Sequence, residues 1–300
     1  MVDAVNLPAG LQMRPLTLDD VGAVVELVNA CEMHDSGRVM LERADLVSDM
    51  GTDGYDRDRD GVVVLDGDRI VAWGMVLHVR GRWADVDPGR RGRGIGTWLM
   101  RWSEDRGRDK GSERMGQTIE DAREEVADMF ASAGYTPRRT SWVLRMDHPE
   151  RPAEPSFPDG IEVRPFRDED ADAALSMFEE AFSEFEDRLP STLATWRSMT
   201  IEREGFRPYD LVLAVDGDRI VGGAFLIDSG GIWVEKLAVH RDHRRRGIAR
   251  GLLQIAFTRS FERGYEHTRL STDSNTGALT LYERIGMHVV ESYTHYAIDL

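Results

Sequence analysis

Three consecutive arginines followed by a glycine, Arg244-Arg245-Arg246-Gly247, are the strongest chemical signal in this 300-residue sequence. They follow residues 234–239, whose apolar and β-branched types favour a strand, and precede an apolar stripe of helical spacing over residues 249–257. A strand that turns through glycine into a helix directs free backbone N–H groups at one spot, where the helix dipole adds positive charge. The pattern predicts an anion-binding turn; a solvated charge run is the alternative.

The common phosphate motifs do not fit this turn. It has neither the Gly-Lys-Ser/Thr ending of a P-loop nor the GxGxxG pattern of a dinucleotide site. Arg244-x-x-Gly247-x-Ala249 instead resembles the pyrophosphate loop of the GNAT acetyltransferases, which binds coenzyme A. Gly247 lacks a Cβ and so allows close approach of the backbone. The resemblance implies cofactor contacts from the loop and the strand before it, at Leu237, Ala238, Val239, Arg244, Arg245, Arg246, Gly247, Ile248 and Ala249.

A second constellation contains a candidate proton donor. Asn275 stands where a helix is expected to begin, as its N-cap, and Tyr282 follows about two helical turns later. This spacing resembles the GNAT motif in which the asparagine contacts the cofactor and the tyrosine protonates the departing thiolate. A core tyrosine on an amphipathic helix is the alternative, and the nearby basic loop favours the catalytic interpretation.

Glu235 is the candidate general base. It precedes Leu237 by two residues in the expected strand, so both side chains should point to the same face. A carboxylate on a mostly buried strand is costly unless it is used or paired. Glu235 is therefore either the base, acting directly or through water, or one half of a structural ion pair.

The chain repeats itself at about half its length. GLQMRPL at 10–16 reappears as GIEVRPF at 160–166, and DGDRIV at 66–71 recurs unchanged at 216–221. Ordered matches at a nearly constant offset indicate two copies of one domain.

Four prolines between the copies indicate a stiff linker, because proline disrupts helices and sheet ladders. We therefore expect an N-terminal domain over residues 1–147, a linker over 148–159 and a C-terminal domain over 160–300.

Both copies have the same expected order of elements. Hairpin strands are expected at 61–66 and 69–78, and again at 210–215 and 219–228, each pair joined by an Asp-Gly turn. The strand, basic loop and helix follow, and then, in the second copy, a strand near 267–272, a helix near 276–284 and a last strand at 287–299. This order predicts an α/β fold with a mixed sheet covered by helices. It is similar to the GNAT fold, which implies two tandem GNAT domains.

The first copy keeps the loop but departs from the pattern elsewhere. Aligning the copies places Phe130 opposite Tyr282, Arg123 opposite Asn275 and Arg82 opposite Glu235. Phenylalanine has no proton to give, so we expect a non-catalytic first domain and catalysis in the second. The first loop remains a further candidate for cofactor binding, through Arg91, Gly92, Arg93, Gly94, Ile95 and Gly96.

Composition and charge limit the partners. A net charge of −16 repels nucleic acid and anionic membranes, and the sequence has no apolar run of membrane-spanning length. The single cysteine, Cys31, and the lack of a signal peptide favour the cytoplasm, and Cys31 is expected in the core. Acidic residues before the second hairpin suit a cationic acceptor or, equally, a solvated face; they are Glu179, Glu180, Glu184, Glu186 and Asp187.

Together these features predict an N-acetyltransferase that moves an acetyl group from acetyl-CoA to a primary amine of a small molecule by direct attack. We expect a monomer or homodimer without a metal. A non-catalytic acyl-CoA-binding protein is the alternative.

Overall fold

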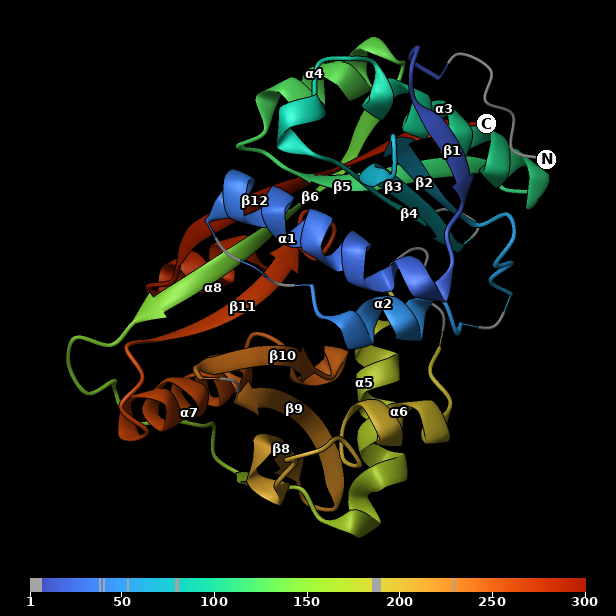
Figure 1. Cartoon of the computed structure of the whole chain (residues 1–300). Coiled ribbons are helices and arrows are strands. Elements are labelled where there is room, and N and C mark those ends of the chain that lie inside the picture. Colours follow the sequence, from blue (N-terminus) through green and yellow to red (C-terminus); the bar gives the residue numbers. More distant parts are fainter. Residues whose placement is uncertain are drawn as a thin grey trace. The chain divides into compact units, whose positions relative to one another are not determined.

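The computed structural model describes residues 7–37, 39, 41–52, 54–78, 81–184, 190–228 and 230–300. They form two compact units, which are shown together in Figure 1. The first unit is Met1–Arg139 with Tyr293–Leu300, and the second is Thr140–Ser292. None of the described helices combines the length and apolar character that a membrane span requires.

Both repeats have the expected succession of elements. The first contains β1 (Gln12–Pro15), η1 (Leu18–Asp20), α1 (Val21–Ser36), α2 (Arg43–Asp49), β2 (Gly61–Asp66), β3 (Arg69–His78), β4 (Gly81–Val86), η2 (Pro88–Arg90), α3 (Ile95–Asp109), β5 (Arg114–Glu120), α4 (Glu124–Ser132) and β6 (Thr136–Asp147). The second contains β7 (Ile161–Pro165), η3 (Asp168–Asp170), α5 (Ala171–Phe182), α6 (Leu193–Met199), η4 (Pro208–Asp210), β8 (Leu211–Asp216), β9 (Arg219–Asp228), β10 (Ile232–Val239), η5 (Arg241–His243), α7 (Ile248–Glu262), β11 (His267–Asp273), α8 (Leu279–Ile285) and β12 (His288–Asp299).

The hairpin predictions are confirmed almost residue for residue. β2, β3 and β9 have the predicted bounds, and β8 begins one residue later than predicted. Gly67 and Gly217 have φ values of 62° and 59°, as the Asp-Gly turns of a hairpin require.

The strand order is the same in the two units. In the first, β1, β2, β3 and β4 pair antiparallel, β5 joins β4 in parallel, and β12 joins β5 antiparallel. In the second, β7, β8, β9 and β10 pair antiparallel, β11 joins β10 in parallel, and β6 joins β11 antiparallel. Each unit is thus a mixed α/β sheet, as the sequence predicts.

The two repeats exchange their last strands: most of β12, from the second repeat, belongs to the first unit, and most of β6, from the first repeat, belongs to the second. Residues 293–299 of β12 pair with β5, and residues 141–147 of β6 pair with β11; β12 is the red strand beside β5 in Figure 1. The compact units therefore differ from the predicted ranges of 1–147 and 160–300 at this strand. Local sequence could not reveal the exchange, because the two strands occupy equivalent positions and suit either sheet.

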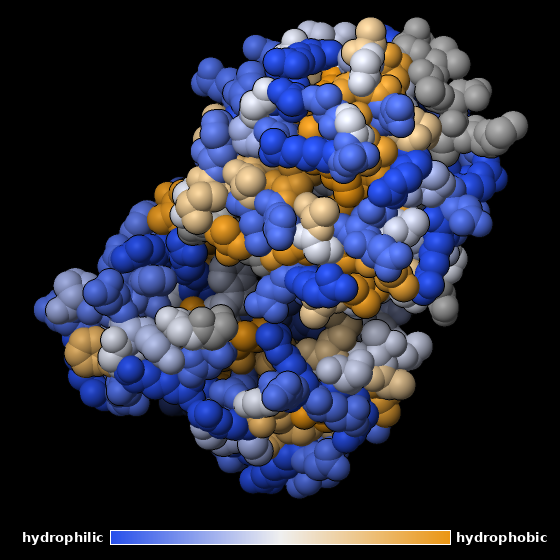
Figure 2. Space-filling model, in the orientation of Figure 1, coloured by the Kyte–Doolittle hydropathy of each residue, from blue (hydrophilic) through white to orange (hydrophobic). Residues whose placement is uncertain are grey.

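Alternate strand residues face opposite helical layers within each unit. Val63 packs in the core with α1 and α2, whereas Val62 and Val64 pack in the core with α3. In the second unit Leu213 packs with α5 and α6, and Val212 with α7. Both sheet faces are covered, which explains why these strands are continuous apolar runs. Hydrophilic residues cover much of the face shown in Figure 2, with hydrophobic residues exposed between them.

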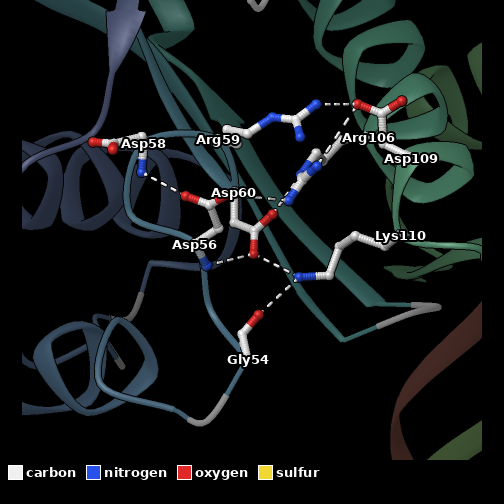
Figure 3. Close-up of polar contacts among 8 residues, drawn as sticks. All are labelled: Gly54, Asp56, Asp58, Arg59, Asp60, Arg106, Asp109 and Lys110. Atoms are coloured by element: carbon white, nitrogen blue, oxygen red, sulfur yellow. Dashed lines mark hydrogen bonds and ion pairs between the residues drawn. The ribbon is translucent and has the colours of Figure 1, made fainter.

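A buried carboxylate fastens the turn before β2 to the end of α3 (Figure 3). Asp60 is fully buried, and its oxygens accept hydrogen bonds from Arg106 Nε at 2.5 Å, Lys110 Nζ at 2.5 Å and Asp56 N at 2.8 Å. Burial opposes the ionisation of Asp60, but these hydrogen bonds outweigh it and lower the pKa of the carboxyl. The network thereby holds the turn that precedes β2 against α3.

Candidate functional site

The basic loop of each repeat has the strand–turn–helix geometry that the sequence predicts. Gly247 is the N-cap of α7 with a φ of 90°, and Gly94 is the N-cap of α3 with a φ of 86°. Arg245 has a φ of 61°, where the first repeat has Gly92 at 73°. The left-handed conformation costs a non-glycine residue about 1–2 kcal/mol. The two loops therefore keep one conformation even where the residue type opposes it.

The N-terminus of α7 can accept an anion. Among the described residues, no side chain caps this helix at Gly247. The first N–H groups of a helix lack intrahelical acceptors, and the helix dipole favours negative charge there. A Cβ built at Gly247 would meet no atom within 4 Å, so the space beside the backbone is open. The predicted contact residues lie around this point: Arg244, Arg245, Arg246 and Gly247 are exposed, Ala249 is half-buried and Ile248 is buried.

The first arginine of each loop contacts the last turn of the α-helix that follows the first strand of its repeat, or the turn just after that helix. Arg244 donates to Glu184 Oε2 at 2.9 Å and to the Val239 carbonyl at 3.3 Å. Arg91 donates to both oxygens of Asp35, at 2.6 and 2.9 Å. These side chains thus brace the loop, and the anion site is formed mainly by backbone.

The acidic residues predicted near an amine acceptor are partly engaged in this bracing. Glu184 pairs with the loop, and Glu180 Oε1 lies 3.0 Å from His240 Nε2. Glu186 and Asp187 lie outside the described residues. Glu180 and Glu184 therefore contact the protein's own basic groups.

Glu235 is not on a buried face, so that premise of its prediction is wrong. The β9–β10 register shifts between Val234 and Lys236, which makes Glu235 the bulged residue of the strand. Its side chain is exposed and accepts a hydrogen bond from Trp233 Nε1 at 2.9 Å. A bulge interrupts the two-residue alternation on which the expected common face with Leu237 depended. Glu235 is accessible to solvent, and its role as base stays a prediction.

The β10 strand leaves one edge open beyond its bulge. Its ladder with β11 covers residues 232–234, whereas its ladder with β9 continues through 239. Within the described residues, β11 thus does not pair with Leu237, Ala238 and Val239, and the Val239 carbonyl accepts from Arg244. Backbone groups on such an edge can pair with an extended ligand. The first repeat shows the same divergence, since β4 and β5 pair at Gly81 and Gly116.

Asn275 is not a helix N-cap, contrary to the prediction. Its backbone N–H donates to Asp273 Oδ1 at 2.9 Å, forming a turn, and Gly277 follows with a φ of 63°. The helix begins later, with Ala278 as its N-cap. The Asp273 carboxylate accepts the backbone N–H groups of Asn275 and Thr276, which forms a turn in place of the first helical turn. Asp side chains commonly accept the N–H two residues further on. Cofactor contact by Asn275 stays a prediction.

Tyr282 lies on α8 with its ring in the core of the second unit. Burial raises the pKa of its hydroxyl to about 12, so the proton is held at neutral pH. The Tyr282 carbonyl accepts the N–H of Met287 at 3.1 Å, and the Phe130 carbonyl accepts the N–H of Tyr135 at 3.0 Å. The shared cap confirms that Phe130 occupies the position of Tyr282 in the first repeat. The side chain of Arg82 lies outside the described residues.

Cys31 is a core residue, as the sequence predicts. Its Sγ donates to the Val86 carbonyl at 3.3 Å, and burial raises the pKa of the thiol to about 11. A thiol that stays protonated is a poor nucleophile.

Sequence reasoning missed four residues that line a cavity in the first unit. Asp85 and Trp73 come from β4 and β3, and Tyr293 and His295 come from the exchanged strand β12. A carboxylate within an expected strand was a usable signal for Asp85. The sequence offered no signal for Tyr293 and His295, because they reach the cavity of the first unit only through the pairing of β12 with β5.

Comparison with known proteins settles the family. The sequence model of the acetyltransferase (GNAT) family matches residues 26–135 and again residues 171–287. The chain belongs to the GNAT acetyltransferase family. It is an N-acetyltransferase built from tandem GNAT domains, as the sequence predicts.

Relatives and solved structures cover nearly the whole chain. A mycothiol acetyltransferase of Pseudarthrobacter chlorophenolicus is 29% identical over 266 residues, covering 84% of this chain and 77% of the relative. One of Geodermatophilus obscurus is 27% identical over 297 residues, covering 93% and 92%. A GCN5-related N-acetyltransferase of Sphaerobacter thermophilus has a TM-score of 0.80 at 31% identity, covering 98% and 97%. A tandem GNAT protein from the clavulanic acid biosynthesis pathway has a TM-score of 0.72 at 16% identity, covering 96% and 98%, which shows the shared fold.

Proposed function

We propose that the protein transfers an acetyl group from acetyl-CoA to a primary amine of a small molecule, with catalysis in the second repeat. The observation that carries this proposal is the buried Tyr282, opposite Phe130 at the same helix position of the first repeat. A hydroxyl with a pKa raised to about 12 is protonated at neutral pH and can act as a donor. The first repeat offers no proton at that position.

The described residues of the second repeat fit acetyl-CoA. The uncapped N-terminus of α7 at Gly247 suits its pyrophosphate, and the open edge at residues 237–239 suits its extended arm. When bound, acetyl-CoA supplies an acetyl group activated as a thioester. Arg244, braced against Glu184, keeps the loop in place for this contact.

Two side chains handle the protons in this proposal. Glu235 Oε1 or Oε2 takes a proton from the substrate ammonium, directly or through a water, for which its exposed position at the bulge is suited. Tyr282 Oη holds the proton that the departing sulfur requires. The two relatives described above are named mycothiol acetyltransferases. For this chain we propose only the class of the acceptor, a small primary amine.

Substitution of the two aligned aromatic residues tests the proposal. Tyr282→Phe removes one hydroxyl and should lower kcat by about 10²–10⁴-fold, while the KM for acetyl-CoA changes little. Phe130→Tyr in the first repeat is the matched control and should leave kcat unchanged. Thiol release with a panel of primary amines measures both. Near-full activity of Tyr282→Phe on the best amine would return Tyr282 to a packing role.

A further inference from the structure

The first unit contains a cavity of about 1010 Å³, and every residue lining it belongs to that unit. The basic loop contributes Arg91 and Gly94, β4 contributes Asp85, and apolar walls come from residues such as Leu99 and Met129. The volume is at the upper end of the range for sites that bind small molecules. It is much larger than a single metal ion or water needs.

Asp85 is the distinctive group of this cavity. One carboxylate oxygen, Oδ2, accepts a hydrogen bond from Trp73 Nε1 at 3.0 Å. Burial raises the pKa of the carboxyl, and the hydrogen bond from Trp73 and the positive charges of Arg123 and Arg91 oppose that shift. Within the described part of the chain, no basic side chain forms an ion pair with Asp85.

The two nearby arginines are already committed to another carboxylate. Asp35 lies 2.6 Å from Arg91 Nη1 and 3.2 Å from Arg123 Nη1. These contacts lower the pKa of Asp35, although burial opposes that shift. Arg91 and Arg123 are thus held by Asp35, and although their charges favour the ionised form of Asp85, neither forms a direct ion pair with it.

The second repeat shows that the fold does not require this carboxylate. Trp73 pairs with Asp85 across β3 and β4, and the same register positions in β9 and β10 are Gly223 and Ala238. Asp85 is half-buried, and a carboxylate partly withdrawn from water without a direct ion pair is costly, so a structural role alone does not explain it. Buried ionisable groups in cavities commonly serve ligands.

We propose that Asp85 makes this cavity a binding site for the ammonium group of a small organic amine, separate from the transfer site of the second repeat. The charge of Asp85 selects a cation, and the apolar walls select one that carries a hydrocarbon body. A metal ion does not fit, because no described group of three or more His, Cys, Asp or Glu side chains could hold one. The site goes beyond the proposed function, since binding there requires no acetyl transfer.

Binding to the full chain without acetyl-CoA tests this site. The probes are n-butylamine, 1,4-diaminobutane and phenethylamine, with 2-phenylethanol as the neutral analogue of the last. The indole N–H resonance of Trp73 reports locally on Asp85 in protein labelled with ¹⁵N-tryptophan, and Trp73→Phe assigns it. We expect at least one amine to shift this resonance, and Asp85→Asn to weaken that binding about tenfold to hundredfold, the value of one charged hydrogen bond. The alcohol should bind no more tightly to the wild type than to Asp85→Asn.

A matched control and a second measurement keep the test decisive. Glu235→Gln removes a carboxylate of the second unit and should leave the Trp73 response unchanged. On the wild type, lowering the pH should weaken amine binding as Asp85 gains a proton, because the amine itself stays charged. The titratable groups facing Asp85 are Arg91, Arg123, and Glu32 and the Cys31 thiol of α1. Failure of all three amines to move the Trp73 resonance, or equal affinity in Asp85→Asn, would overturn the proposal.

Discussion

The two repeats have one strand order and one loop geometry, yet they differ in the groups that could do chemistry. The second repeat has Tyr282 on its last helix and Ala238 on the strand before its loop; the first has Phe130 and Asp85 at those positions. The same fold therefore accepts either pair of residues, and its helices and strands alone do not show which repeat is active. Our two proposals assign proton transfer to the second repeat and ligand binding in a charged cavity to the first.

What the repeats share is the scaffold around the loop. Gly94 and Gly247 have nearly equal φ values, and the first strands end in the same ion pair, Arg14 with Asp20 and Arg164 with Asp170. Substitutions at matched positions can therefore separate shared structure from divergent function.

The largest effect on stability is expected at Asp60, a buried carboxylate with two ion pairs at a position where the second repeat has Asp210. Asp60→Asn would leave Arg106 and Lys110 without their buried partner and should lower the free energy of unfolding by about 3 kcal/mol at neutral pH. Because the pKa of Asp60 is lowered in the folded state, this contribution is present at neutral pH and is lost as pH falls through that pKa. Denaturant unfolding of the full chain measures it.

Asp210 is the matched control for Asp60, since it also precedes the second strand of its repeat. It accepts the Arg207 N–H at 2.9 Å, and within the described residues it forms no ion pair. Asp210→Asn should cost about 1 kcal/mol or less. Equal losses at the two positions would mean that the Asp60 ion pairs contribute nothing.

The next largest effect concerns the cofactor loops. Gly247→Glu places a carboxylate where the pyrophosphate is proposed to bind and should lower kcat/KM for acetyl-CoA about thousandfold. Gly94→Glu meets the same backbone strain, because the φ values are 90° and 86° and the nearest atom to a Cβ at Gly94 is Pro8 Cγ at 3.8 Å. It should leave turnover within about twofold. Steady-state kinetics of the pair compares the loops, and similar losses in both would place transfer in neither repeat alone.

The sequence was sufficient to predict most of the fold, because the hairpins and the loop depend on local patterns. β2, β3 and the Asp-Gly turns follow from apolar runs separated by Asp66-Gly67 and its repeat. The exchange of β6 and β12 could not be predicted, since the choice of partner for a last strand is set by tertiary contacts.

The candidate site was predicted less completely than the fold. Tyr282 and the loop lie on the elements that spacing predicted, but the burial of Glu235 was predicted wrongly because a bulge interrupts the alternation there. Asn275 failed as a cap because the side chain of Asp273 bonds the backbone N–H groups first. Asp85 lay in an expected strand, but its cavity exists only in the folded unit.

A smaller effect on activity is expected at Glu235. Glu235→Gln keeps an oxygen that can accept the Trp233 N–H, so the bulge should persist. If the carboxylate takes the substrate proton, kcat should fall about tenfold and the loss should be partly recovered at high pH, where more amine is already deprotonated. Trp233→Phe, which removes the hydrogen bond but not the base, is the control. A pH–rate profile identical to that of the wild type would exclude Glu235 as base.

The smallest effect, and the one of opposite sign, is expected for Asp85→Asn. Folding raises the pKa of this carboxyl, so the folded chain holds a proton that the unfolded chain releases, and the charged form destabilises the fold above that pKa. The amide can still accept the Trp73 hydrogen bond at Oδ1 and carries no charge, so the Tm of the first unit should rise by about 1–3 °C at pH 8. The gain should shrink as pH falls and Asp85 becomes protonated in the wild type. Calorimetry at pH 8 and pH 5 measures the difference, and a lower Tm for Asp85→Asn at pH 8 would show that the carboxylate stabilises the fold. A raised Tm together with weakened amine binding would show that the first repeat keeps Asp85 for its ligand, at a cost in stability that Ala238 spares the second.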